Sequence, residues 1–175
     1  MDPHRHFQTL AHYNAWASQA LLTALKRVPD DDYRRDCGLF FKSIHGTLNH
    51  LLLGEHRLWR TRFEGAVPQI ASLSQELESD RTALASGLLL EAQAWMPLIA
   101  SWDAPRFDGL LQYTTLRGTA QSLPFAATLA HVFNHSTHHR GQITAALTAM
   151  GRQAPELDMV YMLQAQAQAQ AHSNI

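Results

Sequence analysis

The sequence predicts an all-α protein, a four-helix bundle with a short β-hairpin insertion and a short C-terminal helix. Four long segments repeat apolar residues at steps of three and four, which is the pattern of amphipathic helices. One shorter segment is instead rich in strand-forming residues on both sides of a turn. With 175 residues, of which 46% are hydrophobic and 17% charged, the chain can bury one core. Four such helices bury their apolar faces against one another, which makes a bundle the expected arrangement.

Helix-ending and capping residues set the bounds of the long helices. Pro29, followed by three aspartates, ends the first helix, and Gly151 stops the fourth. Ser72 or Ser74 can cap the third helix, and Pro97 near its end is expected to kink or shorten it. The expected ranges are residues 4–28, 43–63, 72–101 and 124–150.

A hairpin is expected before the fourth helix and a short helix after it. Residues 107–116 and 119–123 favour strands, and the intervening Arg117-Gly118 favours a turn. A short helix is expected over residues 156–163. The following Gln/Ala alternation has no apolar face, which predicts a frayed helix end or a disordered tail. The predicted division is a helical bundle over residues 1–163 and a tail over residues 164–175.

Composition excludes several classes of protein and site. The net charge of −1 gives no electrostatic reason to expect a nucleic-acid partner or a membrane surface. Cys37 is the only cysteine, so an internal disulfide and a cysteine-based zinc site are excluded. We find no uninterrupted run of about 18 apolar residues and no signal peptide, and we therefore expect a cytoplasmic protein.

Four of the 11 histidines lie within nine residues of the fourth helix. With His131 at zero on a helical wheel, His135 lies near 40° and His139 near 80°, while His138 lies near −20°. The apolar face lies at about 100–160°, so His135 and His139 flank the core. Two imidazoles one turn apart can bind one divalent metal. An HxxxH pattern also occurs by chance in many helices.

His50 is a third ligand candidate, on the second helix. It lies at the edge of the apolar face, next to small residues that would leave room for a metal and a ligand: Ser43, Gly46, Thr47 and Gly54. A hydrogen-bonded boundary histidine is the alternative. His45 and His56 fall on the opposite side of the wheel and are expected to be solvated.

Three neutral nitrogens leave coordination positions open, which is typical of catalytic metal sites. Imidazole suits zinc, nickel, iron and copper, and we expect one divalent transition metal, zinc or nickel ahead of iron or manganese. HExxH, Glu-x-x-His, G-x-S-x-G and Gly-rich phosphate loops are all missing. Without a base beside the histidines, the site suits a substrate that the metal itself deprotonates, such as a thiol.

These residues resemble the DinB (damage-inducible) superfamily, related to thiol-dependent S-transferases and mycothiol-dependent maleylpyruvate isomerases. The resemblance spans roughly residues 4–163. It implies an up-down-down-up bundle, commonly dimeric, that holds one divalent metal through His50, His135 and His139. Characterised relatives use a low-molecular-weight thiol as co-substrate, and many members have no known reaction. The matching segments are Tyr13-Asn14-Ala15-Trp16-Ala17, Thr47-Leu48-Asn49-His50 with Trp59, His131-Val132-Phe133-Asn134-His135 and His139-Arg140-Gly141-Gln142.

Other polar residues carry secondary hypotheses. The Tyr13 hydroxyl would act as a catalytic proton donor if it pointed into the metal cavity, and a core tyrosine is the alternative. Glu55 falls near the apolar centre of its helix, where it needs an arginine or a ligating histidine as partner. Arg140 is expected at an exposed or interface position. His131 and His138 are weaker candidate ligands.

Three functions therefore remain open. The first is a metal-dependent enzyme that activates a small thiol for attack on an electrophilic substrate, as an S-transferase or isomerase. The second is a hydrolase with a metal-activated water, and the third a non-catalytic metal-binding stress or interaction protein. The expected partners are a small thiol, an electrophilic substrate and a second copy in a homodimer, with no nucleic acid and no membrane.

Overall fold

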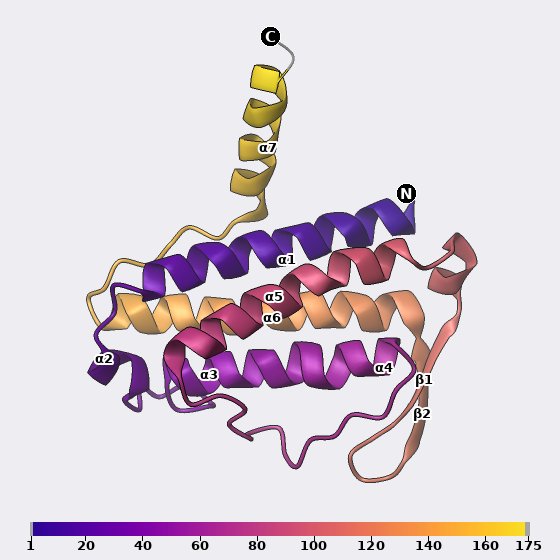
Figure 1. The fold of residues 1–175 in the computed structure, drawn as a ribbon, viewed down its shortest axis with the longest axis horizontal. Coiled ribbons are helices and arrows are strands. Elements are labelled where there is room, and N and C mark those ends of the chain that lie inside the picture. Colours follow the sequence, from indigo (N-terminus) through magenta and orange to yellow (C-terminus); the bar gives the residue numbers. More distant parts are fainter. Residues whose placement is uncertain (1, 174–175) are drawn as a thin grey trace.

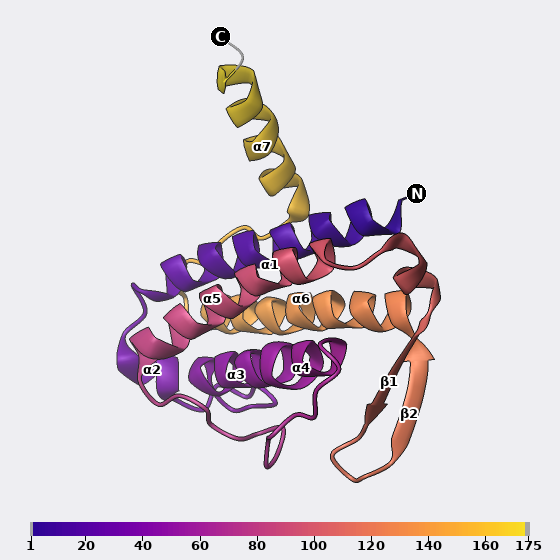
Figure 2. The same cartoon turned by 45° about the vertical axis from the view of Figure 1, so that its right-hand side comes forward.

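The computed structural model describes residues 2–173, and four long helical segments lie side by side in it as a bundle (Figures 1 and 2). The first and fourth run one way along the bundle, and the second and third run the other way (Figure 1). This up-down-down-up order confirms the predicted fold class. The segments are α1 (Pro3–Leu25), the continuous α3–η1–α4 (Ile44–Leu51, Leu52–Arg60 and Thr61–Phe63), α5 (Arg81–Ala100) and α6 (Phe125–Ala149).

Side-chain caps fix where the helices begin. Asp2 caps α1 and Ser43 caps α3, each by accepting a hydrogen bond from a free backbone N–H of the first turn. The expected start of α5 at Ser72 or Ser74 is wrong, because Asp80 caps that helix by accepting from Ala83 N. The preceding loop is held away from helical geometry, since Asn49 Oδ1 accepts from the backbone N–H groups of Leu77 and Glu78.

The middle of the second long segment is π-helical. Residues Leu52–Arg60 form η1, in which the backbone bonds from i to i+5 rather than to i+4. Each residue therefore turns by less than the 100° of an α-helix. Side chains after Leu52 drift away from the positions that an α-helical wheel predicts.

The shorter elements follow the prediction less closely. The short helix α2 (Asp30–Arg34) and the 3₁₀ turn η2 (Ala104–Asp108) were not expected. The hairpin is confirmed: β1 (Leu110–Thr114) pairs antiparallel with β2 (Ala120–Pro124), and the turn contains Gly118 with φ of 81°. Pro97 lies within α5, which continues to Ala100.

The C-terminal helix extends through the Gln/Ala repeat. Helix α7 (Met159–Ser173) begins three residues later than expected and projects away from the bundle (Figures 1 and 2). The tail expected to be frayed or disordered is thus helical up to Ser173, in accordance with the favourable helix propensity of alanine and glutamine. Residues 174–175 of that tail lie outside the described residues.

The core is formed mainly by the four long segments. Helix α5 is long and apolar enough to cross a membrane by length and composition. Its Leu84, Leu88, Trp95 and Ile99 are nevertheless buried in the bundle, against α1 among other elements. These side chains share hydrophobic clusters with residues of the second segment and of α6, and those two helices also contact each other directly.

Candidate metal centre

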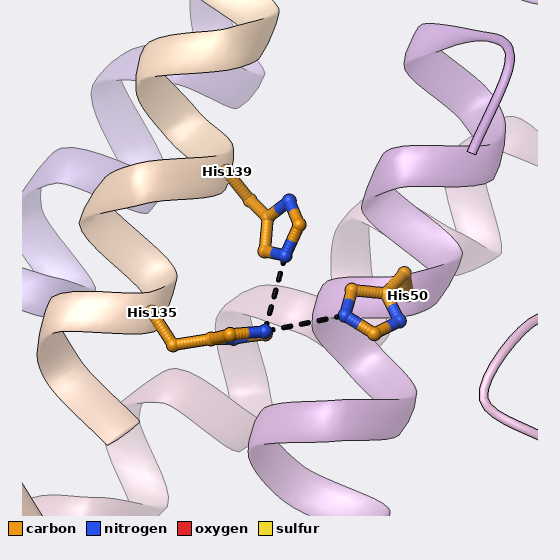
Figure 3. A group of neighbouring side chains, drawn as sticks. All are labelled: His50, His135 and His139. Atoms are coloured by element: carbon orange, nitrogen blue, oxygen red, sulfur yellow. Dashed lines mark hydrogen bonds between the residues drawn. The ribbon is translucent and has the colours of Figure 1, made fainter. Parts of the chain in front are cut away.

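Three imidazoles from two helices converge between α3 and α6 (Figure 3). His50 Nε2 lies 3.3 Å from His135 Nε2, and His139 Nε2 lies 3.1 Å from the same atom. One ring nitrogen from each of the three lies within 4.8 Å of the others. The structure therefore brings together the three residues that the sequence singled out.

These distances fit a common metal ion. Two nitrogens bound at about 2.0–2.1 Å with a tetrahedral angle lie about 3.3 Å apart. The observed separations from His135 Nε2, 3.3 and 3.1 Å, agree with that value. The donor set suits a transition metal, since imidazole is a good ligand for zinc, nickel, iron and copper.

Hydrogen bonds to the other ring nitrogens direct lone pairs into the centre. His50 Nδ1 donates to the Leu73 carbonyl at 2.9 Å, and His139 Nδ1 donates to Gln142 Oε1 at 2.8 Å. Both partners are acceptors only, so each of these rings keeps its proton on Nδ1 and presents an unprotonated Nε2. His135 Nδ1 is buried with no hydrogen-bond partner.

The surroundings favour neutral imidazoles, the form that binds metal. Burial lowers the pKa of His50 below its usual value. Burial, together with the neighbouring imidazoles, lowers the pKa of His135 to about 3. Burial also lowers the pKa of His139 to about 4, against the opposing effect of its bond to Gln142. At neutral pH the cluster therefore carries lone pairs rather than positive charge.

Gly54 and Phe41 shape the walls of the centre. A Cβ on Gly54 would lie 3.6 Å from ring atoms of both His50 and His135, so this glycine leaves the centre open on one side. The Phe41 ring stacks on the His50 ring with centroids 3.7 Å apart. The small residues beside His50 were predicted from the sequence, whereas Phe41 was not, because it precedes the helix and belongs to no periodic pattern.

A buried polar network lies beside the centre and ties α1, η1 and α6 together. The Glu55 carboxylate accepts hydrogen bonds from Asn14 Nδ2 and Ser136 Oγ, and Asn14 Oδ1 accepts one from Arg140. Burial raises the pKa of Glu55, while the bond from Ser136 and the charge of Arg140 oppose this rise. The arginine or ligating histidine expected as the direct partner of Glu55 is therefore replaced by Asn14 and Ser136, and Arg140 reaches Glu55 only through Asn14. The exposed position expected for Arg140 is wrong, because its side chain is buried and satisfies this network.

Two other histidines are also buried, contrary to expectation. His45 is covered by the loop before α5. The Nε2 atom of His45 lies 3.4 Å from Oε1 of Glu76 in that loop. His56 is 1% exposed because it lies in the π-helical segment, whose smaller turn per residue rotates it inward. Burial lowers the pKa of His56 well below its usual value, and the charges of Arg60 and Arg57 add to the effect.

The remaining candidates do not join the cluster. The Tyr13 hydroxyl donates to the Leu157 carbonyl at 2.7 Å, and its ring packs in a cluster with Ala17 and Met162, so its contacts match the core alternative. His131 is exposed and lines a cavity that also borders His50 and His135, and His138 accepts a hydrogen bond from Gln142. We assign none of the three to the metal.

Comparison with known proteins identifies the family of this chain. The family model for DinB matches residues 1–171. The chain belongs to the DinB family. Protein DinB of Bacillus subtilis (strain 168) is 28% identical to it over 147 residues, which make up 81% of this chain and 84% of that relative. Membership and a buried three-histidine cluster together support a metal-binding role for this DinB-family protein.

Proposed function

We propose that this DinB-family protein is a metal-dependent enzyme in which His50, His135 and His139 hold one divalent transition metal that activates a low-molecular-weight thiol. The observation that carries the proposal is the convergence of three Nε2 atoms at metal-binding separations. A protein that used these histidines only for packing would not direct two unprotonated nitrogens at one point.

The chemistry follows from the groups that surround the centre. A divalent ion held there would supply Lewis acidity, which lowers the pKa of a bound thiol. No Asp or Glu lines the adjoining cavity within the described residues, and the carboxylate of Glu55 is already occupied by Asn14 and Ser136. A thiol, with a usual pKa of about 8.5, needs no such base to ionise.

Metal content is the first test. We expect the protein, purified without an affinity tag, to contain about one equivalent of zinc or nickel, or else of iron or manganese, by elemental analysis. His135→Ala should abolish binding, whereas His138→Ala, one turn away and exposed, should leave it intact. Less than a tenth of an equivalent of metal per chain, with a melting temperature that a chelator leaves unchanged, would favour a non-catalytic stress or interaction protein that holds no metal.

Thiol dependence is the second test. Turnover of a small electrophile should require both the metal and a small thiol. Metal-dependent turnover that proceeds equally well without any thiol would instead support the hydrolase alternative, with water as the nucleophile. The proposal includes a cytoplasmic homodimer, and light scattering on the purified protein tests the oligomeric state.

A further inference from the structure

A cavity of about 610 Å³ opens directly onto the metal centre. Its floor includes His50 and His135, and its walls come from the second helical segment and from the hairpin turn. The volume lies within the usual range for small-molecule sites. Apolar side chains form part of its lining, among them Leu58, Trp59 and Leu116.

Arg62 lies in the wall of this cavity and has no acidic partner. Only 6% of its surface is exposed, and its guanidinium lies 4.8 Å from the centroid of Trp59 and 4.2 Å from that of Tyr113. Its Nε is buried without a hydrogen-bond partner. In residues 2–173 no carboxylate forms an ion pair with it.

The neighbouring arginines show that this lack of a partner is specific to Arg62. Arg57 pairs with Glu91, and Arg60 pairs with Glu64 and with Glu91. All three arginines belong to one helical segment, and of these three only Arg62 lines the cavity; the other arginine of the lining, Arg117, is exposed on the hairpin turn. Burial of an unpaired charge is costly, and a guanidinium stays protonated in proteins, so the cavity presents a fixed positive charge that lacks a counter-ion.

We propose that this cavity binds an elongated substrate whose terminal carboxylate pairs with Arg62 while its reacting end faces His50 and His135. The assignment of the reacting end rests on the proposed function; the carboxylate site does not. A guanidinium that packs against two neighbouring aromatic rings, Trp59 and Tyr113, is restricted in orientation and can form two parallel hydrogen bonds to a carboxylate. Leu58 and Leu116 provide apolar contact for the chain between the two ends.

The helix sets the length of this substrate. Arg62 follows His50 by 12 residues, which corresponds to at most about 18 Å along the axis. Helical side chains lean toward the N-terminus, so the Arg62 guanidinium reaches back toward the histidines and shortens that distance. The carboxylate can belong either to the thiol or to the electrophile.

The first experiment tests the carboxylate site without thiol or metal. Binding of octanoate and of octanamide to the metal-free protein is measured by calorimetry. We expect octanoate to bind at least about tenfold more tightly, since a hydrogen bond to a charged group exceeds a neutral one by that order. Arg62→Gln should reduce the preference strongly, and more than Arg117→Gln does at the exposed arginine that also lines the cavity. Arg62→Lys should keep part of it.

Arg57→Gln is the matched control, since Arg57 lies on the same segment but outside the cavity lining. It should keep the full preference for octanoate. Equal affinity for the two probes in the unmodified protein, or the same preference in Arg62→Gln, would overturn the proposal. If Arg62→Gln fails to fold, the proposal is tested by the preference for octanoate over octanamide, measured in the unmodified protein and in Arg62→Lys.

Two further measurements separate this inference from the proposed function. Binding of 3-mercaptopropanol, a neutral thiol, to zinc-loaded and metal-free protein tests thiol activation alone. If the zinc-loaded protein binds the thiol but shows no preference for octanoate, only the carboxylate site is refuted. If it prefers octanoate but does not bind the thiol, only the thiol proposal is refuted. A gain of more than about tenfold for 8-mercaptooctanoate over octanoate in the zinc-loaded protein assigns the carboxylate to the thiol, and no gain assigns it to the electrophile.

Discussion

Replacement of Asn14 by alanine is expected to be among the most destabilising changes away from the histidines. The Asn14 side chain is fully buried and bridges two charged groups: it donates to Glu55 and accepts from Arg140. Each hydrogen bond to a charged group contributes about 1.5–3 kcal/mol, so the loss of both should cost about 3–6 kcal/mol. In a domain of this size that loss lowers the melting temperature by about 6–24 °C.

Urea unfolding of the metal-free protein, followed by circular dichroism, measures this loss without a contribution from metal binding. Asn134→Ala is the control, because Asn134 is exposed on α6 and its replacement should change the free energy of unfolding by no more than about 0.5 kcal/mol. A loss below about 1 kcal/mol for Asn14→Ala would refute the reasoning, since it would show that the buried Glu55 and Arg140 do not need this bridge.

Three further predictions concern the centre and its surroundings. Gly54→Ala should keep metal binding and change stability little, because the added Cβ fits at 3.6 Å, whereas Gly54→Leu should reduce metal content by elemental analysis. Gln142→Ala should weaken metal affinity about 10- to 100-fold in a competition titration, since His139 loses the acceptor that orients it. His56 is neutral when folded and binds a proton when unfolded below about pH 6.5, so its contribution to stability is lost as the pH falls. Urea unfolding of metal-free His56→Phe from pH 6.5 to 4.5 should show a weaker pH dependence, by up to about 1.4 kcal/mol per pH unit; identical slopes would contradict this.

The polar network gives the metal centre a rigid frame. Ser136 and Arg140 of the network alternate on α6 with His135 and His139, and Glu55 follows the glycine that leaves the centre open. The network therefore fixes the rotation of α6 and of η1, on which the direction of the ligating imidazoles depends. Precise positioning of ligands by such outer contacts is common in metal sites.

Three features near the centre could not be predicted from the sequence, and each has its own physical reason. His45 was expected to be solvated, but its exposure depends on a loop some thirty residues away that folds over it. His56 was misplaced because the wheel assumes α-helical geometry, which η1 does not have. The burial of Arg62 without an acidic partner was not predicted, because an arginine near a helix end is ordinarily solvated or paired.

The amino-acid sequence by itself determined the four long helices, the hairpin and the placement of His135 and His139 on one helix face. These features depend on residues three or four positions apart, and such spacing is local. The sequence also singled out His50 as a third candidate, but only the tertiary structure decided that it meets the other two, that Arg140 is buried and that Arg62 faces a cavity beside the centre. These relations depend on how distant helices pack and rotate against one another, and packing is a property of the whole chain.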